Sequence, residues 1–473
     1  MPIKLYRISG FKGIDQSCGQ NALDPGSSPD ACNMDTSDGG LSVSSGFVKA
    51  VDTPVPCADG IGFMHIFNHE GGAQFIVMAR REVYAYRHGG WDLIHTYETN
   101  AHNSFSCEEA QIDGTDYLII GCGEAQLIKY DGARASQFGS AEKLSDIHVK
   151  YLSMYMGRLF SAGDPEHPNR LYWSQLPGSG RTIEDWGPVS SSPNVEGGHA
   201  EIGDTCGDPI VAITAMSNQL LIFKRNSLYR LIGDRPSNFT IERIEAQIEP
   251  MAHTSLVRRG NAAYYMTDAG LYVFNGVTSY LSPDAKGIRH ILKNAASADC
   301  RAAIARDMLF FAMKDASGES FVIEYDLSRR AYMLRRGFDV SHLCALDGAL
   351  YMINGKKYVY RFGEGDSYDG EPILAWWSTP LTDLGDKGCI KQLRRLYMRG
   401  SAHEDAAVLL DAIAGDNTST HRVLLPSSEK RVLEIPLNNE GRTFSLVFYN
   451  EGGGRFSLNG GVELELSLRR RTE

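Results

Sequence analysis

The sequence predicts an all-β fold, with a β-propeller of seven four-stranded blades followed by a C-terminal β-sandwich. Glycine accounts for 49 of the 473 residues, about a tenth of the chain where ~7% is usual. Tyrosine and phenylalanine are frequent, with 22 and 19 copies, and this composition favours short strands joined by tight turns. A short apolar and aromatic segment also recurs along most of the chain.

The recurring segment has four residues and begins about every 46 residues. An apolar run precedes each copy, a further run lies upstream of it, and another follows, with turn dipeptides such as Asp-Gly or Asn-Gly between runs. Turns of this kind between β-branched and aromatic runs indicate β-hairpins. Each unit is therefore predicted to contain four antiparallel strands. The copies begin at Val83, Leu127, Leu171, Leu228, Leu271, Val322 and Val359.

A period of 40–50 residues is typical of a propeller blade. One small sheet cannot bury both of its faces, whereas seven sheets around an axis bury them and leave only short edges. The predicted propeller covers residues 57–370, with blades at 57–98, 105–140, 148–200, 208–246, 252–283, 299–337 and 341–370. The third blade is the longest because 163–169 and 175–204 resemble inserted loops. The alternative is an irregular series of meanders without circular closure.

Residues 1–56 are rich in Gly, Ser, Asp and Asn and contain few apolar runs. They predict an extended N-terminal arm that closes the propeller or reaches a neighbouring subunit. A helix is predicted over 282–295, between the fifth and sixth blades. Ser282 would be its N-cap and Pro283 its first helical residue.

Residues 371–473 lack the period and predict a β-sandwich of jelly-roll type. The last strand, Val462–Leu468, alternates strictly between apolar and polar residues, so one face is expected to be buried and the other hydrated. Eight strands are expected, at 373–378, 393–399, 407–412, 421–425, 431–435, 443–449, 455–458 and 462–468.

Charge and cysteine content limit the partners and the compartment. The net charge of −11 disfavours binding to a phosphate backbone without a local basic patch. The nine cysteines are scattered and form no CxxC pair, which fits reduced thiols in a protein made in a cytosol. No apolar run approaches the ~18 residues of a membrane span, and the N-terminus shows no signal-peptide pattern. We therefore expect no membrane span.

No residue is nominated as catalytic, cofactor-binding or metal-binding. His69-Glu70 is followed by glycines that forbid a zinc-protease helix. The turn Gly121–Gly123 lacks the helix that a phosphate loop needs, and Asp35–Gly40 lacks the closing glutamate of a calcium loop. A glycosidase would need two carboxylates near the propeller axis. Any large protein offers such pairs, so we expect a protein that is not an enzyme. The carboxylates considered for that role are Glu108, Glu109, Glu324 and Asp326.

Three blocks of the sequence resemble a family of tailed-bacteriophage virion proteins. Near the N-terminus, Gly10–Asp15, Leu23–Asp35 and Asp38–Phe47 follow the pattern G-x-N/D … P-x-x-x-x-x-x-x-N-x-x … G-x-L-x-x-R/S-x-G. Ser44-Ser45 departs from it, because members often carry a basic residue there. The resemblance covers nearly the whole chain. The second block comprises 169–174, 185–186, 208–213 and 220–233, and the third runs from 375–379 to 456–471.

The resemblance implies a β-propeller subunit of the tail nozzle or tail stabilisation ring of a short-tailed phage, usually present in six copies around a DNA channel. It implies a cyclic homo-oligomer, a hexamer, in contact with neighbouring tail or connector, portal-adaptor or fibre proteins. The expected location is the virion tail, after assembly in the host bacterial cytoplasm. DNA would pass without specific binding, since carboxylates facing the lumen repel phosphates. No cofactor is implied.

Two other functions remain open at the level of the sequence. One is a tail-tip protein that binds a receptor or acts on a polysaccharide as a glycosidase. An exposed aromatic platform with paired carboxylates would favour it. The other is a monomeric bacterial propeller that serves as an interaction module.

Overall fold

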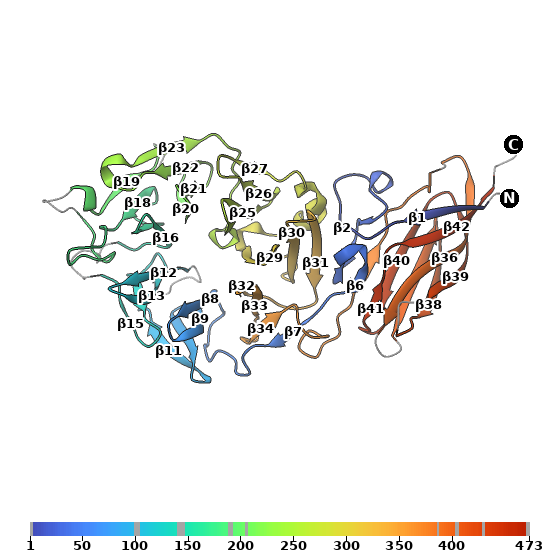
Figure 1. Cartoon of the computed structure of the whole chain (residues 1–473), viewed down its shortest axis with the longest axis horizontal. Coiled ribbons are helices and arrows are strands. Elements are labelled where there is room, and N and C mark those ends of the chain that lie inside the picture. The colour runs from blue at the N-terminus through green and yellow to red at the C-terminus, as the bar shows by residue number, and fades with distance from the viewer. Residues whose placement is uncertain are drawn as a thin grey trace.

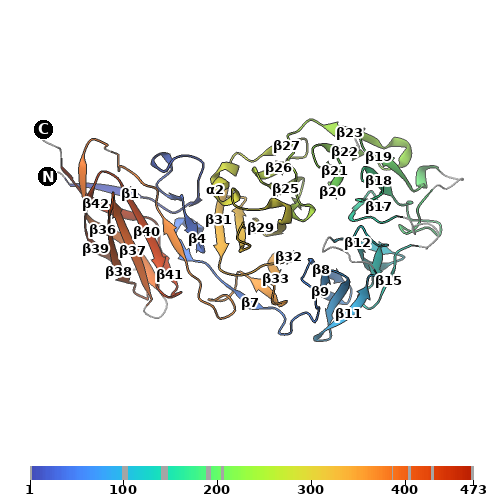
Figure 2. The same ribbon diagram turned by 180° about the vertical axis from the view of Figure 1, so that it is seen from behind.

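The computed structural model describes residues 3–98, 105–139, 147–187, 193–203, 207–385, 387–402, 406–427 and 431–469. The chain is nearly all β, as predicted, and most of its strands belong to four-stranded antiparallel sheets. Figures 1 and 2 show an elongated molecule with a ring of sheets at one end and the C-terminal sheets at the other. Such a ring is the arrangement expected of a β-propeller.

Five sheets of the ring each consist of four strands that follow one another in the sequence. The first contains β8 (Phe63–His69), β9 (Gly72–Ala79), β10 (Glu82–Arg87) and β11 (Gly90–Thr96). The second contains β12 (Ser106–Ile112), β13 (Thr115–Gly121), β14 (Ile128–Tyr130) and β15 (Ala135–Gln137). The third contains β16 (Tyr151–Tyr155), β17 (Arg158–Ala162), β18 (Arg170–Trp173) and β19 (Gly198–Glu201). The fourth contains β20 (Ile210–Ala215), β21 (Leu220–Lys224), β22 (Leu228–Ile232) and β23 (Thr240–Ile244). The fifth contains β24 (Val257–Arg259), β25 (Ala262–Thr267), β26 (Gly270–Phe274) and β27 (Ser279–Leu281).

The sixth and seventh sheets include strands from the N-terminal arm. The sixth contains β28 (Arg301–Ala305), β29 (Met308–Lys314), β30 (Ser320–Asp326) and β31 (Ala331–Arg336), extended by β2 (Gly13–Ile14) and β3 (Ser27–Ser28). The seventh contains β32 (His342–Leu346), β33 (Ala349–Ile353) and β34 (Val359–Phe362), and its fourth strand is β7 (Phe47–Lys49). In every sheet the recurring four-residue segment forms or overlaps the third strand, as the repeat predicts.

Neighbouring sheets share apolar cores. One cluster lies between the first and second sheets, and the next three join the second to the third, the third to the fourth and the fourth to the fifth. A further cluster joins the seventh sheet to the first and includes Val77, Tyr84, Ile353 and Val359. The innermost strands β32 and β8 are also in contact. The ends of the series therefore meet.

The C-terminal residues form two further sheets. The eight strands predicted here all occur: β35 (Trp376–Ser378), β36 (Ile390–Ala402), β37 (Ala407–Ala414), β38 (Asn417–Leu424), β39 (Val432–Gly441), β40 (Phe444–Asn450), β41 (Phe456–Leu458) and β42 (Val462–Arg469). The alternation of β42 was a misleading signal, because Glu465 and Ser467 on its polar face are buried. Glu465 accepts a hydrogen bond from Tyr397 at 3.1 Å and pairs with Arg395 at 3.4 Å. The polar face is thus covered by polar partners at Glu465, whereas the side chain of Glu463 remains 38% exposed.

The N-terminal arm threads through both parts of the molecule. Its remaining strands are β1 (Ile3–Ile8), β4 (Ala31–Cys32), β5 (Met34–Asp35) and β6 (Leu41–Val43). Strand β1 pairs with β42, β4 with β35, and β6 with both β5 and β41. With β2 and β7, the arm joins four different sheets. One large apolar cluster accordingly contains residues of the arm, of the last three ring sheets and of both C-terminal sheets.

The helix predicted over 282–295 is much shorter than expected. The segment contains a 3₁₀ turn, Ala285–Ile288, followed by α2 (Arg289–Leu292). Ser282 is not its cap and Pro283 is not its first residue, because the 3₁₀ turn begins at Ala285 with Asp284 at the N-cap position. The other 3₁₀ turns are Gln20–Ala22, Ser37–Gly39, Pro193–Val195, Pro236–Asn238, His253–Ser255 and Ser297–Asp299. Among the residues described, no helix has the length and apolar character needed to cross a membrane.

Candidate functional site at the junction of the ring and the C-terminal sheets

Asn33 is the main polar tie between the arm, the ring and the C-terminal sheets. Its side-chain amide donates to the carbonyl oxygens of Arg336 at 3.0 Å and Leu374 at 2.8 Å. Its Oδ1 accepts from the backbone N–H of Arg336 at 3.0 Å and from the hydroxyl of Tyr368 at 2.9 Å. The residue is 3% exposed and has a φ of 54°, a conformation that asparagine tolerates better than most residues. Every hydrogen-bonding position of the buried amide is therefore used.

Two glycines of the arm are required by close packing. A β-carbon on Gly46 would overlap the carbonyl oxygen of Ser367, and one on Gly26 would overlap the carbonyl oxygen of Gly10. The backbone of Gly46 also forms two hydrogen bonds with the segment that follows β34. Its N–H donates to the carbonyl oxygen of Gly365, and its carbonyl oxygen accepts from the N–H of Gly363, each at 2.9 Å. Gly10, Gly26, Asn33 and Gly46 all lie in or beside the segments that carry the phage-protein resemblance.

Aromatic residues of the arm fill cores on both sides of the junction. Phe47 stacks on Tyr368 at 5.1 Å and meets Tyr360 at 4.8 Å. Phe11 lies edge-on to Trp377 at 5.5 Å within the C-terminal core. Aromatic pairs in these geometries contribute ~0.5–1.5 kcal/mol beyond the burial of their area. The arm is thus held by packing at both ends.

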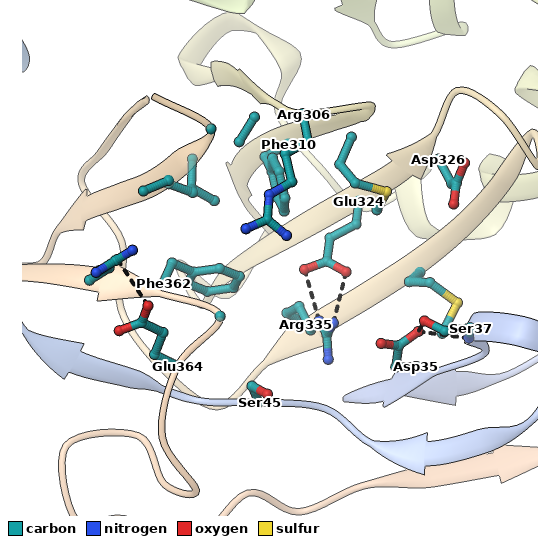
Figure 3. Close-up of a pocket in the computed structure, with 18 of the residues that line it drawn as sticks. Asp35, Ser37, Ser45, Arg306, Phe310, Glu324, Asp326, Arg335, Phe362 and Glu364 are labelled. Carbon is teal, nitrogen blue, oxygen red and sulfur yellow. Dashed lines mark hydrogen bonds and ion pairs between the residues drawn. The ribbon is translucent and has the colours of Figure 1, made fainter. Parts of the chain in front are cut away.

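A pocket of about 390 Å³ lies between the sixth sheet, the seventh sheet and the arm (Figure 3). Its centre is occupied by the Glu324–Arg335 ion pair, in which two parallel hydrogen bonds of 2.9 Å join the guanidinium to the carboxylate. Both side chains are more than nine-tenths buried. The rest of the wall includes the rings of Phe310 and Phe362 and the charged residues Asp35, Arg306, Asp326, Arg361 and Glu364.

The carboxylates considered from the sequence fall into two separate places. Asp326 accepts from Arg329 at 2.7 Å, next to the Glu324–Arg335 pair. Burial raises the pKa of Asp326, but hydrogen bonds from Ser328 and Arg329 outweigh burial and lower it to about 2. Glu108 and Glu109 instead lie on β12, the innermost strand of the second sheet. Glu109 contacts His65 at 2.8 Å and Glu108 accepts from the N–H of Met154 at 2.7 Å.

The other sequence features occupy ordinary turns. Nδ1 of His69 accepts from the N–H of Gly71 at 3.0 Å, and Gly121 ends β13. Asp35 accepts from the N–H of Ser37 at 2.9 Å at the start of a 3₁₀ turn. Within the described part of the chain, no group of three or more His, Cys, Asp or Glu side chains has the arrangement of a metal site.

Sequence reasoning did not single out Arg335 or Tyr368, and it quoted Asn33 only as part of a motif. No local pattern marks these residues, because their partners lie far away in the chain. Asn33 and Tyr368 are 335 residues apart. Only the asparagine of the resemblance pattern pointed to this position.

Comparison with known proteins adds three solved structures of low similarity. No family model matches the chain, and no curated protein matches it. The extracellular domain of a one-component system from B. thetaiotaomicron has a TM-score of 0.43 and 14% identity, with 82% of this chain covered. The WD40 domain of Neurospora crassa Pan2 has a TM-score of 0.42 and 10% identity, and the match covers 70% of this chain and 97% of that domain.

The third structure is PorZ, a surface component of the type-IX secretion system of Porphyromonas gingivalis. Its TM-score is 0.41 and its identity 12%, with 78% of this chain covered. The chain spans about half the length of the first and third structures, 47% and 46% respectively.

Proposed function

We propose that the chain is a structural, non-enzymatic component of a bacteriophage virion. In this proposal it is a subunit of the tail nozzle or hub, or of a head-to-tail connector ring, around the DNA exit channel. Residues 57–370 form a closed seven-bladed propeller, residues 371–473 form a β-sandwich, and residues 1–56 form the arm that joins them.

Two features support the closed propeller. The first strands labelled in Figure 1, β8, β12, β16, β20 and β32, lie on the side of their sheets toward the centre of the ring, and neighbouring first strands such as β12, β16 and β20 are in contact. The seventh sheet takes its outer strand from the arm, where Phe47 pairs with Phe362 and Lys49 with Tyr360. A strand from one end of the chain that completes a sheet from the other end closes a ring without leaving a long free edge.

The observation that carries the structural role is the position of the arm residues in the resemblance pattern. Asn33 and Gly46 are buried at the junction, where they bond to the ring and to the segment leading into the C-terminal sheets. A subunit that transmits force along a tail needs its parts to move as one body. Hydrogen bonds and a shared apolar core across the junction supply that property, because separating the parts would expose both.

The proposed partners are further copies of the chain, in a cyclic hexamer, and neighbouring tail or connector, portal-adaptor or fibre proteins. Strand β1 is at an edge of the seven-stranded sheet and exposes Ile3 and Leu5, each 61% accessible. An edge strand with apolar side chains is suited to pairing with another chain. The net charge of −11 favours passage of DNA without specific binding.

Light scattering of the purified protein over a hundredfold concentration range tests this proposal. We expect a stable species near six times the chain mass of 52.1 kDa. A monomer at every concentration, together with hydrolysis of a host polysaccharide that is abolished by Glu108→Gln or Glu109→Gln, would overturn the structural role. That pair of results would favour the tail-tip glycosidase instead.

A further inference from the structure

The innermost strands of the ring bring their first residues together at one end of its axis. Tyr151, Arg301 and His342 begin β16, β28 and β32, and Phe63 begins β8. Because the sheets repeat one strand order around the ring, the beginnings of these strands lie at the same mouth. Direct contacts agree with this placement: the Ser106 hydroxyl donates to the carbonyl of Lys150, and the rings of Phe63 and His342 lie 4.5 Å apart.

Four basic side chains gather at this mouth: Lys150, His253, Arg301 and His342. We call them the axial basic cluster. Lys150 Nζ lies 5.1 Å from the ring of Tyr151, which lies 5.2 Å from the ring of His253. Arg301 Nη1 donates to the hydroxyl of Thr254, the residue after His253, at 3.1 Å. Strands β28 and β32, which carry Arg301 and His342, are in contact. The cluster therefore draws on the third, fifth, sixth and seventh sheets.

His253 also links opposite sides of the ring. Its Nε2 lies 2.9 Å from the carbonyl oxygen of Phe105, the residue that precedes β12 in the second sheet. A carbonyl oxygen only accepts, so Nε2 carries the proton. The backbone carbonyl thus holds one nitrogen of His253 and leaves Nδ1 for another partner.

The cluster contains polar groups without partners. His342 is 4% exposed, and neither of its ring nitrogens has a hydrogen-bond partner. Nε of Arg301 is likewise buried without one. Among the described residues, neither Lys150 nor Arg301 forms an ion pair with a carboxylate. Two acidic groups nearby have other partners, since Glu109 contacts His65 and Glu108 accepts from the N–H of Met154. The charges of Asp299 and Glu124 partly offset the effect of burial on the pKa of Arg301 and Lys150, respectively.

Burial and mutual repulsion act on the charges of the cluster. Burial is the larger cause in each case, and it lowers the pKa of Lys150 to about 8 and that of His253 to about 3. Arg301 lowers both values further, and it also lowers the pKa of His342. Positive charges brought together without an ion-paired carboxylate are costly, and a buried unpartnered polar group is usually completed by water, an ion or a ligand.

We propose that the axial basic cluster binds a compact oxyanion, a phosphate or carboxylate group, at this mouth of the ring. Arg301 and Lys150 supply its positive charge, and His253 Nδ1 and the nitrogens of His342 supply further hydrogen-bonding positions. Two cavities of about 210 Å³ each adjoin the cluster. One is lined by Ser106, Tyr151, His253, Arg258 and the carboxylate of Glu108, and the other by Arg301 and Asp299. This site is separate from the arm junction and does not depend on the virion role.

The test is calorimetric titration of the phosphate-free full-length protein with inorganic phosphate and, separately, with acetate, each against potassium chloride at equal ionic strength. We expect saturable binding of at least one of the two anions at one site per chain. Binding should be more than about tenfold weaker in Arg301→Met, because a charge-assisted hydrogen bond is lost. Phosphate binding alone would assign a phosphate group, and acetate binding alone a carboxylate group.

Arg81→Met is the matched control, since Arg81 also donates to a backbone carbonyl, that of Tyr97 at 2.9 Å, but lies outside the cluster. It should leave binding unchanged. If Arg301→Met does not fold, as judged by circular dichroism, the same titrations are carried out on Lys150→Met instead. Binding should also take up protons, seen as a heat that depends on the ionisation enthalpy of the buffer, because an anion restores the charge of the histidines. No binding of either anion, or equal binding by Arg301→Met or its substitute and the wild type, would overturn the proposal.

Discussion

Asn33 concentrates four hydrogen bonds in one buried side chain, so its removal should be costly. In Asn33→Ala, the carbonyls of Arg336 and Leu374 lose their donor, and the N–H of Arg336 and the hydroxyl of Tyr368 lose their acceptor. Each buried group left unpaired costs free energy, and we expect the free energy of unfolding to fall by about 2–4 kcal/mol. Urea denaturation followed by fluorescence measures it. Asn68→Ala, at an exposed position, should change stability by less than about 0.5 kcal/mol.

The Glu324–Arg335 pair permits a double-mutant test. Arg335→Met leaves the buried carboxylate of Glu324 without its partner and should destabilise the fold by about 3–5 kcal/mol. The double variant Glu324→Leu/Arg335→Met removes both charges and should recover most of that loss, because a pair of apolar side chains needs no partner. Denaturation of the two variants measures the difference. Equal stability of the single and double variants would mean that the pocket supplies Glu324 with water.

His253 should make stability fall in acid. Its pKa is lowered to about 3 in the folded chain, chiefly by burial, against ~6.5 when unfolded. Between these values the unfolded chain binds a proton that the folded chain does not. The free energy of unfolding therefore falls as pH drops below ~6.5, by up to about 1.4 kcal/mol per pH unit for this group. Urea midpoints of His253→Gln between pH 7 and 5 should fall less steeply than those of the wild type. A residual slope should remain, since the pKa of His342 is lowered as well.

Sequence information was strongest where a strand carries its own pattern. The recurring segments such as Leu271–Phe274 and all eight C-terminal strands have apolar periodicity over four or more residues, and they form strands. The arm strands β2 to β6 span two or three residues each. Strands β2, β4 and β6 pair with strands hundreds of residues away, and β3 and β5 pair with β2 and β6. No local period could reveal them. The predicted helix failed because Gly287 interrupts the segment and a 3₁₀ turn replaces its first half.

The residues of the two candidate sites differ in the same way, because one set belongs to a local sequence pattern and the other does not. The glycines and the asparagine of the arm were quoted from the sequence only as parts of the resemblance pattern. The structure supplies the physical reason, which is close packing at Gly26 and Gly46 and a φ of 54° at Asn33. The axial basic cluster did not stand out. Lys150, His253, Arg301 and His342 are separated by up to 192 positions and look, one at a time, like ordinary charges at strand ends. Only the circular arrangement of the sheets brings them to one mouth.

Strand β7 is the element on which closure of the ring depends. Phe47→Ala removes a ring that stacks on Tyr368 and contacts Tyr360, and should cost about 3–5 kcal/mol. The loss should be local at first, because β7 is three residues long and is paired with β34 and, through Phe47, bridged to Tyr368. Hydrogen exchange should therefore accelerate in β34 before it does so in β13 or β21. Val48→Ala, at an exposed side chain on the same strand, is the control. Uniform acceleration of hydrogen exchange across all sheets would contradict the expectation that β7 separates from β34 before the other sheets open.

At the scale of the whole molecule, the charge of the chain and the exposed edge strand act against each other in assembly. The chain carries a net charge of −11, so copies would repel one another in the proposed ring. Ile3 and Leu5 on β1 offer apolar contact and a free strand edge. Repulsion between subunits weakens when salt shortens the Debye length from ~30 Å at 0.01 M to ~8 Å at 0.15 M, whereas apolar contact does not weaken.

Added salt should therefore strengthen self-association rather than weaken it. In sedimentation velocity at fixed protein concentration, the fraction of the large species should rise between about 0.01 M and 0.15 M sodium chloride as screening removes the repulsion. Ile3→Lys/Leu5→Lys should abolish that rise, since it removes the apolar side chains of β1 while lowering the net negative charge, which by itself would favour association. The exposed Leu93→Lys on β11, far from β1, is the control for the added charge. Dissociation of the large species by salt would instead mean that ion pairs hold the subunits together, and the β1 edge would then not be the interface.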